Sequence, residues 1–103
     1  MRPTPRSEDE IEAAIQAKAL ANPRVTPADL DAEITRAQYH VFEGSCLTVC
    51  CLTLANGFTV TGQSACASPD NFHAELGQFI ARKNAREQIW PLLGFRLRDQ
   101  LAK

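Results

Sequence analysis

Residues 46–86 read CLTVCCLTLANGFTVTGQSACASPDNFHAELGQFIARKNAR, and this stretch decides the fold of the chain. Its first half predicts two strands, 46–54 and 58–65, because β-branched and apolar side chains are concentrated there. Asn56-Gly57 between them is typical of a tight hairpin turn, since both residues tolerate the positive φ that such turns require. The second half predicts an amphipathic helix, and a hairpin delivered onto a helix is the smallest unit that buries one sheet face.

The alternation of side chains along the two strands predicts their register. Pairing Leu54 with Phe58 sorts the side chains into two sets, because successive residues of a strand point to opposite faces. One face then carries Cys46, Cys50, Leu52, Leu54, Phe58, Val60 and Cys66. The other, called here the outer sheet face, carries Leu47, Val49, Cys51, Thr53, Thr59, Thr61 and Gln63. A shift of one residue mixes apolar and polar side chains on both faces, so we expect the first pairing.

The helix after the hairpin is predicted to begin at Ser68-Pro69-Asp70, where a capping side chain precedes a proline. Its apolar residues recur at helical spacing, and we expect the following ones to face the sheet: Phe72, Leu76, Phe79 and Ile80. Pro91 predicts an end or a kink of this helix, and an amphipathic helical segment follows up to residue 101.

The N-terminal part of the chain predicts a tail and a peripheral helix. Residues 1–6 hold two prolines and no apolar anchor, so we expect a flexible tail. Ser7 and Glu10 form a capping box for a helix from about residue 8 to residue 20. Its apolar stripe is thin, which predicts light docking at the edge of the domain, over residues 7–22, or a surface that faces a partner.

A second, short helix is predicted to begin at Thr26-Pro27, where the threonine caps and the proline occupies the first helical position. Three apolar residues fall on one face of this helix: Leu30, Ile34 and Ala37. Residues 39–42 are strand-prone and predict a third strand at the edge of the sheet. The whole pattern predicts a single α+β domain over residues 7–103, in which N-terminal helices and an antiparallel sheet of two or three strands pack on a long C-terminal helix, in the order α-β-β-β-α.

Composition and charge narrow the class of protein. The chain has 103 residues, of which 45% are apolar, enough for a buried core. Its net charge of −1 excludes a whole-molecule attraction to nucleic acid or to a membrane surface. No apolar run is long enough to span a bilayer, and the first ten residues lack the apolar segment of a secretory signal. We therefore expect a cytoplasmic protein with reduced cysteines.

Metal binding by the cysteines is the first candidate chemistry. Zinc sites are usually built from close pairs such as C-x-x-C, which this chain lacks, and Cys50 and Cys51 point to opposite faces of their strand. No spacing pairs a cysteine with a histidine as a general base. We therefore expect no metal, no cofactor and no catalytic residue, with Cys46, Cys50 and Cys66 as small core side chains. A disulfide between Cys46 and Cys66 fits the register, but a reducing compartment disfavours it.

The outer sheet face is the second candidate site. Leu47, Val49 and Cys51 form an apolar strip there, bordered by the threonines Thr53, Thr59 and Thr61. An uncovered apolar patch on a small protein often marks an interface, which here would serve a homodimer, a captured host protein or a small polar ligand. The alternative is that the N-terminal helix folds over this face.

Nucleic-acid binding is the third candidate function. The predicted order of elements resembles in outline the layout of double-stranded-RNA-binding domains, which read shape and phosphates. Those domains carry a basic cluster at the start of the last helix, where this chain has Ser-Pro-Asp-Asn over 68–71. A smaller basic patch follows later in the helix, formed by Arg82, Lys83 and Arg86. Without the cluster the main source of phosphate affinity is missing, so nucleic acid is the less favoured partner.

The chain also resembles a family of small tailed-phage and prophage proteins, named after gene product 49 of one podophage and gene 66 of another. The resemblance covers residues 25–101 and is carried by VTPADLDAEI, LTVCCLTLANGFTVTGQSACASPDNF, GQFIARKNA and IWPLLGFRLRDQL. It implies an accessory, non-virion protein in the cytoplasm of an infected bacterium, and it transfers no catalytic residue. Together with the residues above, it predicts a non-enzymatic protein that binds a host macromolecule or sequesters a small host signal.

Overall fold

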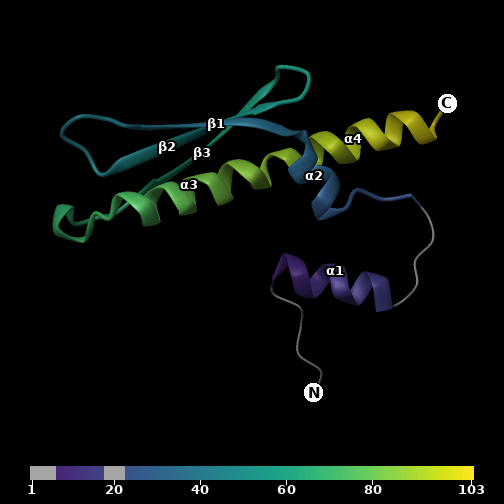
Figure 1. Ribbon diagram of the computed structural model, residues 1–103, viewed down its shortest axis with the longest axis horizontal. Coiled ribbons are helices and arrows are strands. Elements are labelled where there is room, and N and C mark those ends of the chain that lie inside the picture. Colours follow the sequence, from purple (N-terminus) through teal and green to yellow (C-terminus); the bar gives the residue numbers. More distant parts are fainter. Residues whose placement is uncertain (1–6, 18–22) are drawn as a thin grey trace.

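The computed structural model describes residues 7–17 and 23–103 (Figure 1). The predicted tail, 1–6, and the predicted last turn of the first helix, 18–20, lie outside the described residues. The elements, in chain order, are α1 (Glu8–Ala17), α2 (Pro27–Glu33), β1 (Ile34–Val41), β2 (Leu47–Leu54), β3 (Thr59–Ala65), the 3₁₀ turn η1 (Pro69–Asn71), α3 (Ala74–Glu87) and α4 (Ile89–Leu101). The protein is therefore α+β, with N-terminal helices and an antiparallel sheet packed on a long C-terminal helical segment.

The three strands form one antiparallel sheet in the order β1-β2-β3, with β2 in the centre. The predicted hairpin register is confirmed, because Thr53 lies opposite Thr59 and the Leu54 amide donates to the Phe58 carbonyl at 2.8 Å. The turn has the expected chemistry. Gly57 adopts a φ of 89°, and the Asn56 side-chain oxygen accepts a hydrogen bond from the Phe58 amide at 2.9 Å.

Strand β1 corrects one prediction. The spacing of Ile34 and Ala37 predicted that α2 would continue through them, but α2 ends at Glu33 and both residues belong to β1. The segment ITRAQYHV is rich in β-branched and aromatic side chains, and β2 offers it a free edge to pair with. Pairing with β2 therefore overrides the short helical periodicity, with a register irregularity between Ile34 and Arg36.

Helix α3 packs on the inner face of β2 and β3, but through different residues from those predicted. Ala81 and Ala85 are fully buried against the sheet, next to Gly77. The side chains predicted to face the sheet are exposed instead: Phe72, Leu76, Phe79 and Ile80. The reason is a close approach of the backbones, since a Cβ on Gly62 would lie 2.1 Å from the Ala85 nitrogen. At that separation only small side chains fit between helix and sheet.

The predicted start of α3 is wrong, whereas its predicted end is confirmed. Ser68 makes no side-chain capping bond, because the chain forms only the 3₁₀ turn η1 before it becomes extended at Phe72. The His73 side chain caps α3 instead, and its Nδ1 accepts a hydrogen bond from the Leu76 amide at 3.2 Å. The predicted break near Pro91 is confirmed, since α3 ends at Glu87 and α4 begins at Ile89.

The core lies where the inner sheet face meets α2, α3 and the start of α4 (Figure 1). Its buried apolar residues are Leu30, Cys50, Leu52, Leu54, Val60, Ala81, Ala85, Ile89 and Leu93. Phe58 was predicted to join this face but is exposed, because it follows the turn directly and lies at the end of the sheet. The Thr48 side chain is buried among these residues, and its hydroxyl has no hydrogen-bond partner within residues 7–17 and 23–103.

Candidate functional site

The structure gathers the predicted residues of the outer sheet face on one surface. Strand β2 alternates strictly between buried residues and half-buried ones, so the half-buried set points away from α3. That set is Leu47, Val49, Cys51 and Thr53. On β3, Thr59 and Thr61 lie on the same face and are exposed, with Thr61 directly opposite Cys51. An apolar strip on the central strand, bordered by threonine hydroxyls, therefore crosses this face.

Strand β1 adds residues to this face that sequence reasoning missed. His40 lies opposite Val49, and its ring contacts Phe42 edge-on with the ring centroids 4.6 Å apart. Phe42 is 49% exposed, so a large apolar ring borders the strip on the β1 side. Gln38 lies opposite Cys51 in the same way. The sequence feature that would have shown this is the alternation of side chains along Ile34–Val41. It was overlooked because Ile34 and Ala37 were assigned to the preceding helix.

Helix α1 does not fold over the outer sheet face. Its ion pairs run to Arg24 and to Arg86 of α3, on the helical side of the molecule (Figure 1). Helix α3, which packs on β2 and β3, lies against the inner face. Within residues 7–17 and 23–103, the apolar strip around Val49 therefore stands without a covering helix.

The edge of the sheet beside this strip is hollowed and polar. A hollow of about 300 Å³ is lined by Val49, Thr61, Gly62, Gln63, Asn84 and Gln88. The Asn84 side-chain nitrogen donates to the Gln63 carbonyl at 2.8 Å, so one backbone acceptor of the exposed strand is already satisfied. The hydroxyl and amide groups around Val49 can donate hydrogen bonds as well as accept them.

The basic residues proposed for nucleic acid do not form a free cationic patch. Arg86 donates to both carboxylate oxygens of Glu8 and to Asp31, the last at 2.8 Å. Its guanidinium also lies 6.0 Å from the centre of the Trp90 ring. The hydrogen bonds that Arg86 donates to Glu8 and Asp31 raise the pKa of Arg86, so its positive charge is fixed but compensated by the two carboxylates. Arg82 is half-buried, which leaves Lys83 as the exposed member of the three.

Of the three cysteines predicted as core side chains, one is buried and two are half-buried. Cys50 is fully buried in the core, and burial raises the pKa of its thiol. Cys46 and Cys66 are half-buried at the end of the hairpin, where a hydrogen bond with Cys66 raises the pKa of the Cys46 thiol. Raised pKa values keep thiols protonated and weakly nucleophilic. In the described part of the chain, no three histidine, cysteine or carboxylate side chains gather closely enough to hold a metal ion.

Comparison with known proteins gives one match. The model of the phage protein (N4 Gp49/phage Sf6 gene 66) family matches residues 25–101, most of the chain and all of the sheet, α3 and α4. Helix α1 lies outside the matched residues. No curated protein and no solved structure matches the chain. None of the described helices is long and apolar enough to cross a membrane.

Proposed function

Because the chain belongs to this phage protein family, we propose that it is a non-catalytic accessory protein of the cytoplasm of an infected bacterium. In this proposal it acts by binding, through the outer sheet face, and its partner is a protein of the host. The alternative is that the same face binds and sequesters a small signalling molecule of the host. The family itself is one of phage proteins without an assigned activity, so the argument for binding rests on this chain's own surface.

The observation that carries the proposal is the uncovered apolar strip on the central strand. Leu47, Val49 and Cys51 follow one another on a face that no described helix covers. His40, opposite Val49, links this strip to the exposed ring of Phe42. Contiguous apolar surface of this kind, rimmed by polar side chains, is typical of protein interfaces. The length of the strip along β2 favours a macromolecule, whereas the hollow beside Val49 is where a small ligand would bind.

Nucleic acid receives less support from the same structure. The α-β-β-β-α order is present, but Glu8 and Asp31 compensate the charge of Arg86. Phosphate binding gains its affinity when free cationic side chains displace the counterions of the nucleic acid. Of the three residues in the predicted patch, only Lys83 is exposed. A gel shift at low salt, with wild type and with Arg82→Glu/Lys83→Glu, tests this alternative directly: retardation that the double variant abolishes would favour it.

The experiment for the proposed function compares two aspartate substitutions on opposite surfaces. Val49→Asp places a charge in the centre of the outer sheet face, whereas Phe79→Asp places one on the exposed side of α3. We expect affinity capture from infected cells to recover a host protein with wild type and Phe79→Asp, and at least about tenfold less with Val49→Asp. Circular dichroism checks that both variants stay folded. Equal recovery with Val49→Asp would show that the interface is elsewhere.

Native mass spectrometry distinguishes a host partner from self-association. A dimer that Val49→Asp converts to a monomer would assign the outer sheet face to a second copy of the chain and overturn the host-partner proposal. A monomer that carries extra mass of a small molecule would favour the sequestered signal instead. Arg86 is unsuitable as a control position here, because reversing its charge would also break the contacts with α1 and α2.

A further inference from the structure

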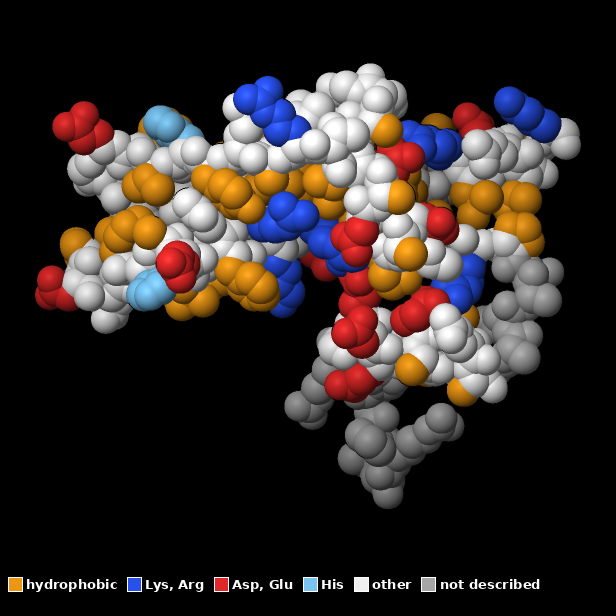
Figure 2. Space-filling view, viewed as in Figure 1, with side chains coloured by type: hydrophobic (Ala, Val, Ile, Leu, Met, Phe, Trp, Pro, Cys, Tyr) orange, Lys and Arg blue, Asp and Glu red, His pale blue; other side chains and the backbone are white. Residues whose placement is uncertain are grey.

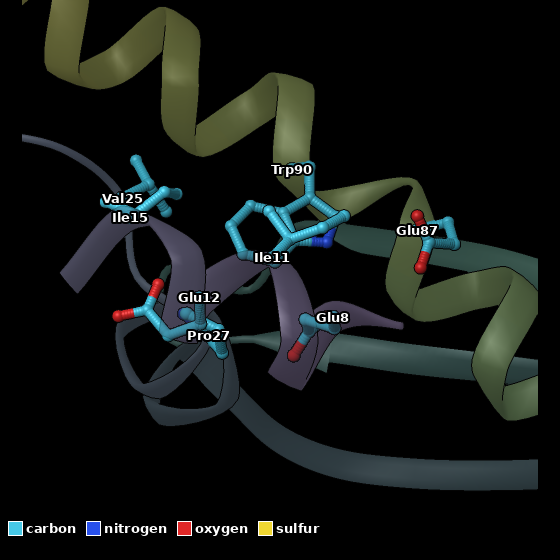
Figure 3. Close-up of a pocket in the computed structure, with 8 residues that line it drawn as sticks. All are labelled: Glu8, Ile11, Glu12, Ile15, Val25, Pro27, Glu87 and Trp90. Carbon is cyan, nitrogen blue, oxygen red and sulfur yellow. The ribbon is translucent and has the colours of Figure 1, made fainter. Parts of the chain in front are cut away.

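Helix α1 lies over a groove whose floor is Trp90, the single tryptophan of the chain (Figure 3). Ile11 and Ile15, four residues apart on α1, approach the groove from one side. Val25 and Pro27 line it at the start of α2. The groove is therefore a largely apolar trough between α2 and the junction of α3 with α4, with the Glu87 side chain at its border, and α1 presents to it the two isoleucines of a single helical face.

Charge pairs hold α1 at both borders of this groove. Arg24 donates to both carboxylate oxygens of Glu12, at 2.7 and 2.6 Å, and Arg86 holds Glu8 in the same two-pronged way. The Arg24 hydrogen bond lowers the pKa of Glu12, so this carboxylate is ionised well into the acid range. Figure 2 shows acidic side chains gathered on α1, next to basic side chains of the remaining molecule. The groove thus recognises a helix by an apolar floor and two arginines.

The fit of α1 in this groove is loose. A hollow of about 390 Å³, half open to solvent, lies between the helix and Trp90. Not one residue of α1 is fully buried, and Ile11 is still 48% exposed. An occupant held by its own packing would bury its apolar residues and leave no such cavity. The groove therefore has room for a bulkier helix than the one it holds.

We propose that this groove is a docking site for a short acidic amphipathic helix of another protein, and that such a helix displaces α1. Arg24 and Arg86 determine where the incoming helix must carry its carboxylates. One carboxylate lies three residues before an apolar residue and the other directly follows that residue, as Glu8 and Glu12 do around Ile11. A second apolar residue follows four positions after the first. The unfilled volume favours aromatic or leucine side chains at these two places. This surface is separate from the outer sheet face, so the proposal does not depend on the proposed function.

The first test uses Trp90 as the reporter in the full chain. Ile15→Asp puts a charge against the groove. Ala13→Asp puts the same charge on the exposed side of α1 and is the control, although it costs more helix propensity than Ile15→Asp. We expect Ile15→Asp to shift Trp90 emission to the red and to raise its quenching by acrylamide at least about twofold. Ala13→Asp should leave both unchanged. If both variants show the same Trp90 emission, α1 does not cover Trp90 in a way that a charge at position 15 can disrupt, and the proposal is wrong.

The second test measures docking in trans with a dye-labelled peptide of residues 7–17, SEDEIEAAIQA, in which Ile11→Phe fills the cavity. The tethered α1 competes at high effective concentration, so we expect the full-length Ile15→Asp chain to bind this peptide about tenfold or more tightly than wild type. The same peptide with Glu8→Gln and Glu12→Gln should bind at least about tenfold more weakly. Failure of the peptide to bind the folded Ile15→Asp chain would refute the docking site.

A third possible result is that two copies of the chain exchange their α1 helices. A dimer of wild type that disappears in Ile15→Asp would place α1 of a second copy in the groove, and would overturn the assignment to a foreign helix. If Ile15→Asp proves unfolded by circular dichroism, Glu12→Gln serves as the opened chain in both tests, because it removes the charge that Arg24 holds without adding one to the groove.

Discussion

Helices α3 and α1 are held to the rest of the molecule in opposite ways. Helix α3 meets the sheet through Gly77, Ala81 and Ala85, with its backbone so close to β3 that Gly62 has no room for a side chain. Helix α1 buries no residue completely and is held by the ion pairs of Glu8 and Glu12. Helix α3 is therefore held by close packing against the sheet, whereas α1 is held mainly by ion pairs.

The difference shows which part of the molecule is permanent. Close contact between apolar surfaces excludes water and is not screened by salt, so α3 and the sheet form one cooperative unit. Ion pairs that are only partly buried contribute little each, and added salt weakens them further. Helix α1 is therefore suited to leave its site while the sheet and α3 stay folded.

The largest effect is expected from closing the gap between α3 and β3. Gly62→Ala forces a methyl group against the Ala85 backbone, so we expect the free energy of unfolding to fall by about 3 kcal/mol or more. Gly94→Ala in α4 is the control, since nothing lies near its added methyl group, and it should stabilise by about 0.5–1 kcal/mol. Urea denaturation measures both. A tolerated Gly62→Ala would mean that α3 does not approach β3 so closely.

A smaller effect, of opposite sign, is expected at Thr48. Its buried hydroxyl has no hydrogen-bond partner among the described residues. Thr48→Val therefore keeps the shape of the side chain beneath Gly77 and removes a costly unpaired group. We expect the protein to gain about 1 kcal/mol of stability. Thr61→Val on the outer sheet face should change stability by less than about 0.5 kcal/mol. A loss of stability in Thr48→Val would show that the hydroxyl has a partner and that the α3 contact is not purely apolar.

The smallest effect on global stability is expected at Glu12 of α1. The pKa of Glu12 is lowered by Arg24, so its contribution is present above the ordinary glutamate pKa of about 4.3 and is lost as the pH falls through the lower folded value. We expect Trp90 emission to shift to the red on acidification below about pH 4, while far-ultraviolet circular dichroism keeps the sheet signal. Glu12→Gln should show the shifted emission already at pH 7. An acid shift that persists unchanged in Glu12→Gln would assign it to another group.

Much of this architecture could be predicted from residues that are close in the chain. The hairpin register follows from the alternation on either side of Asn56-Gly57, and the helix break follows from Pro91. The six proposed residues of the outer sheet face could be named in advance for the same reason, since period-two alternation fixes which strand residues share a face. The sequence predicted a strand at 39–42, but not that His40 and Phe42 lie on the outer sheet face, because that depends on the register with β2.

What the sequence determined by itself is therefore local: strand, turn, cap and break, each decided by neighbours within a few positions. The tertiary structure decided which face of α3 turns to the sheet, because the contact of Gly62 with Ala85 forbids the bulky face that helical spacing favoured. It also decided where α1 lies, through an ion pair between Glu8 and Arg86, which are 78 positions apart. Such contacts depend on how complete elements fit together, and no local pattern of residues records that fit.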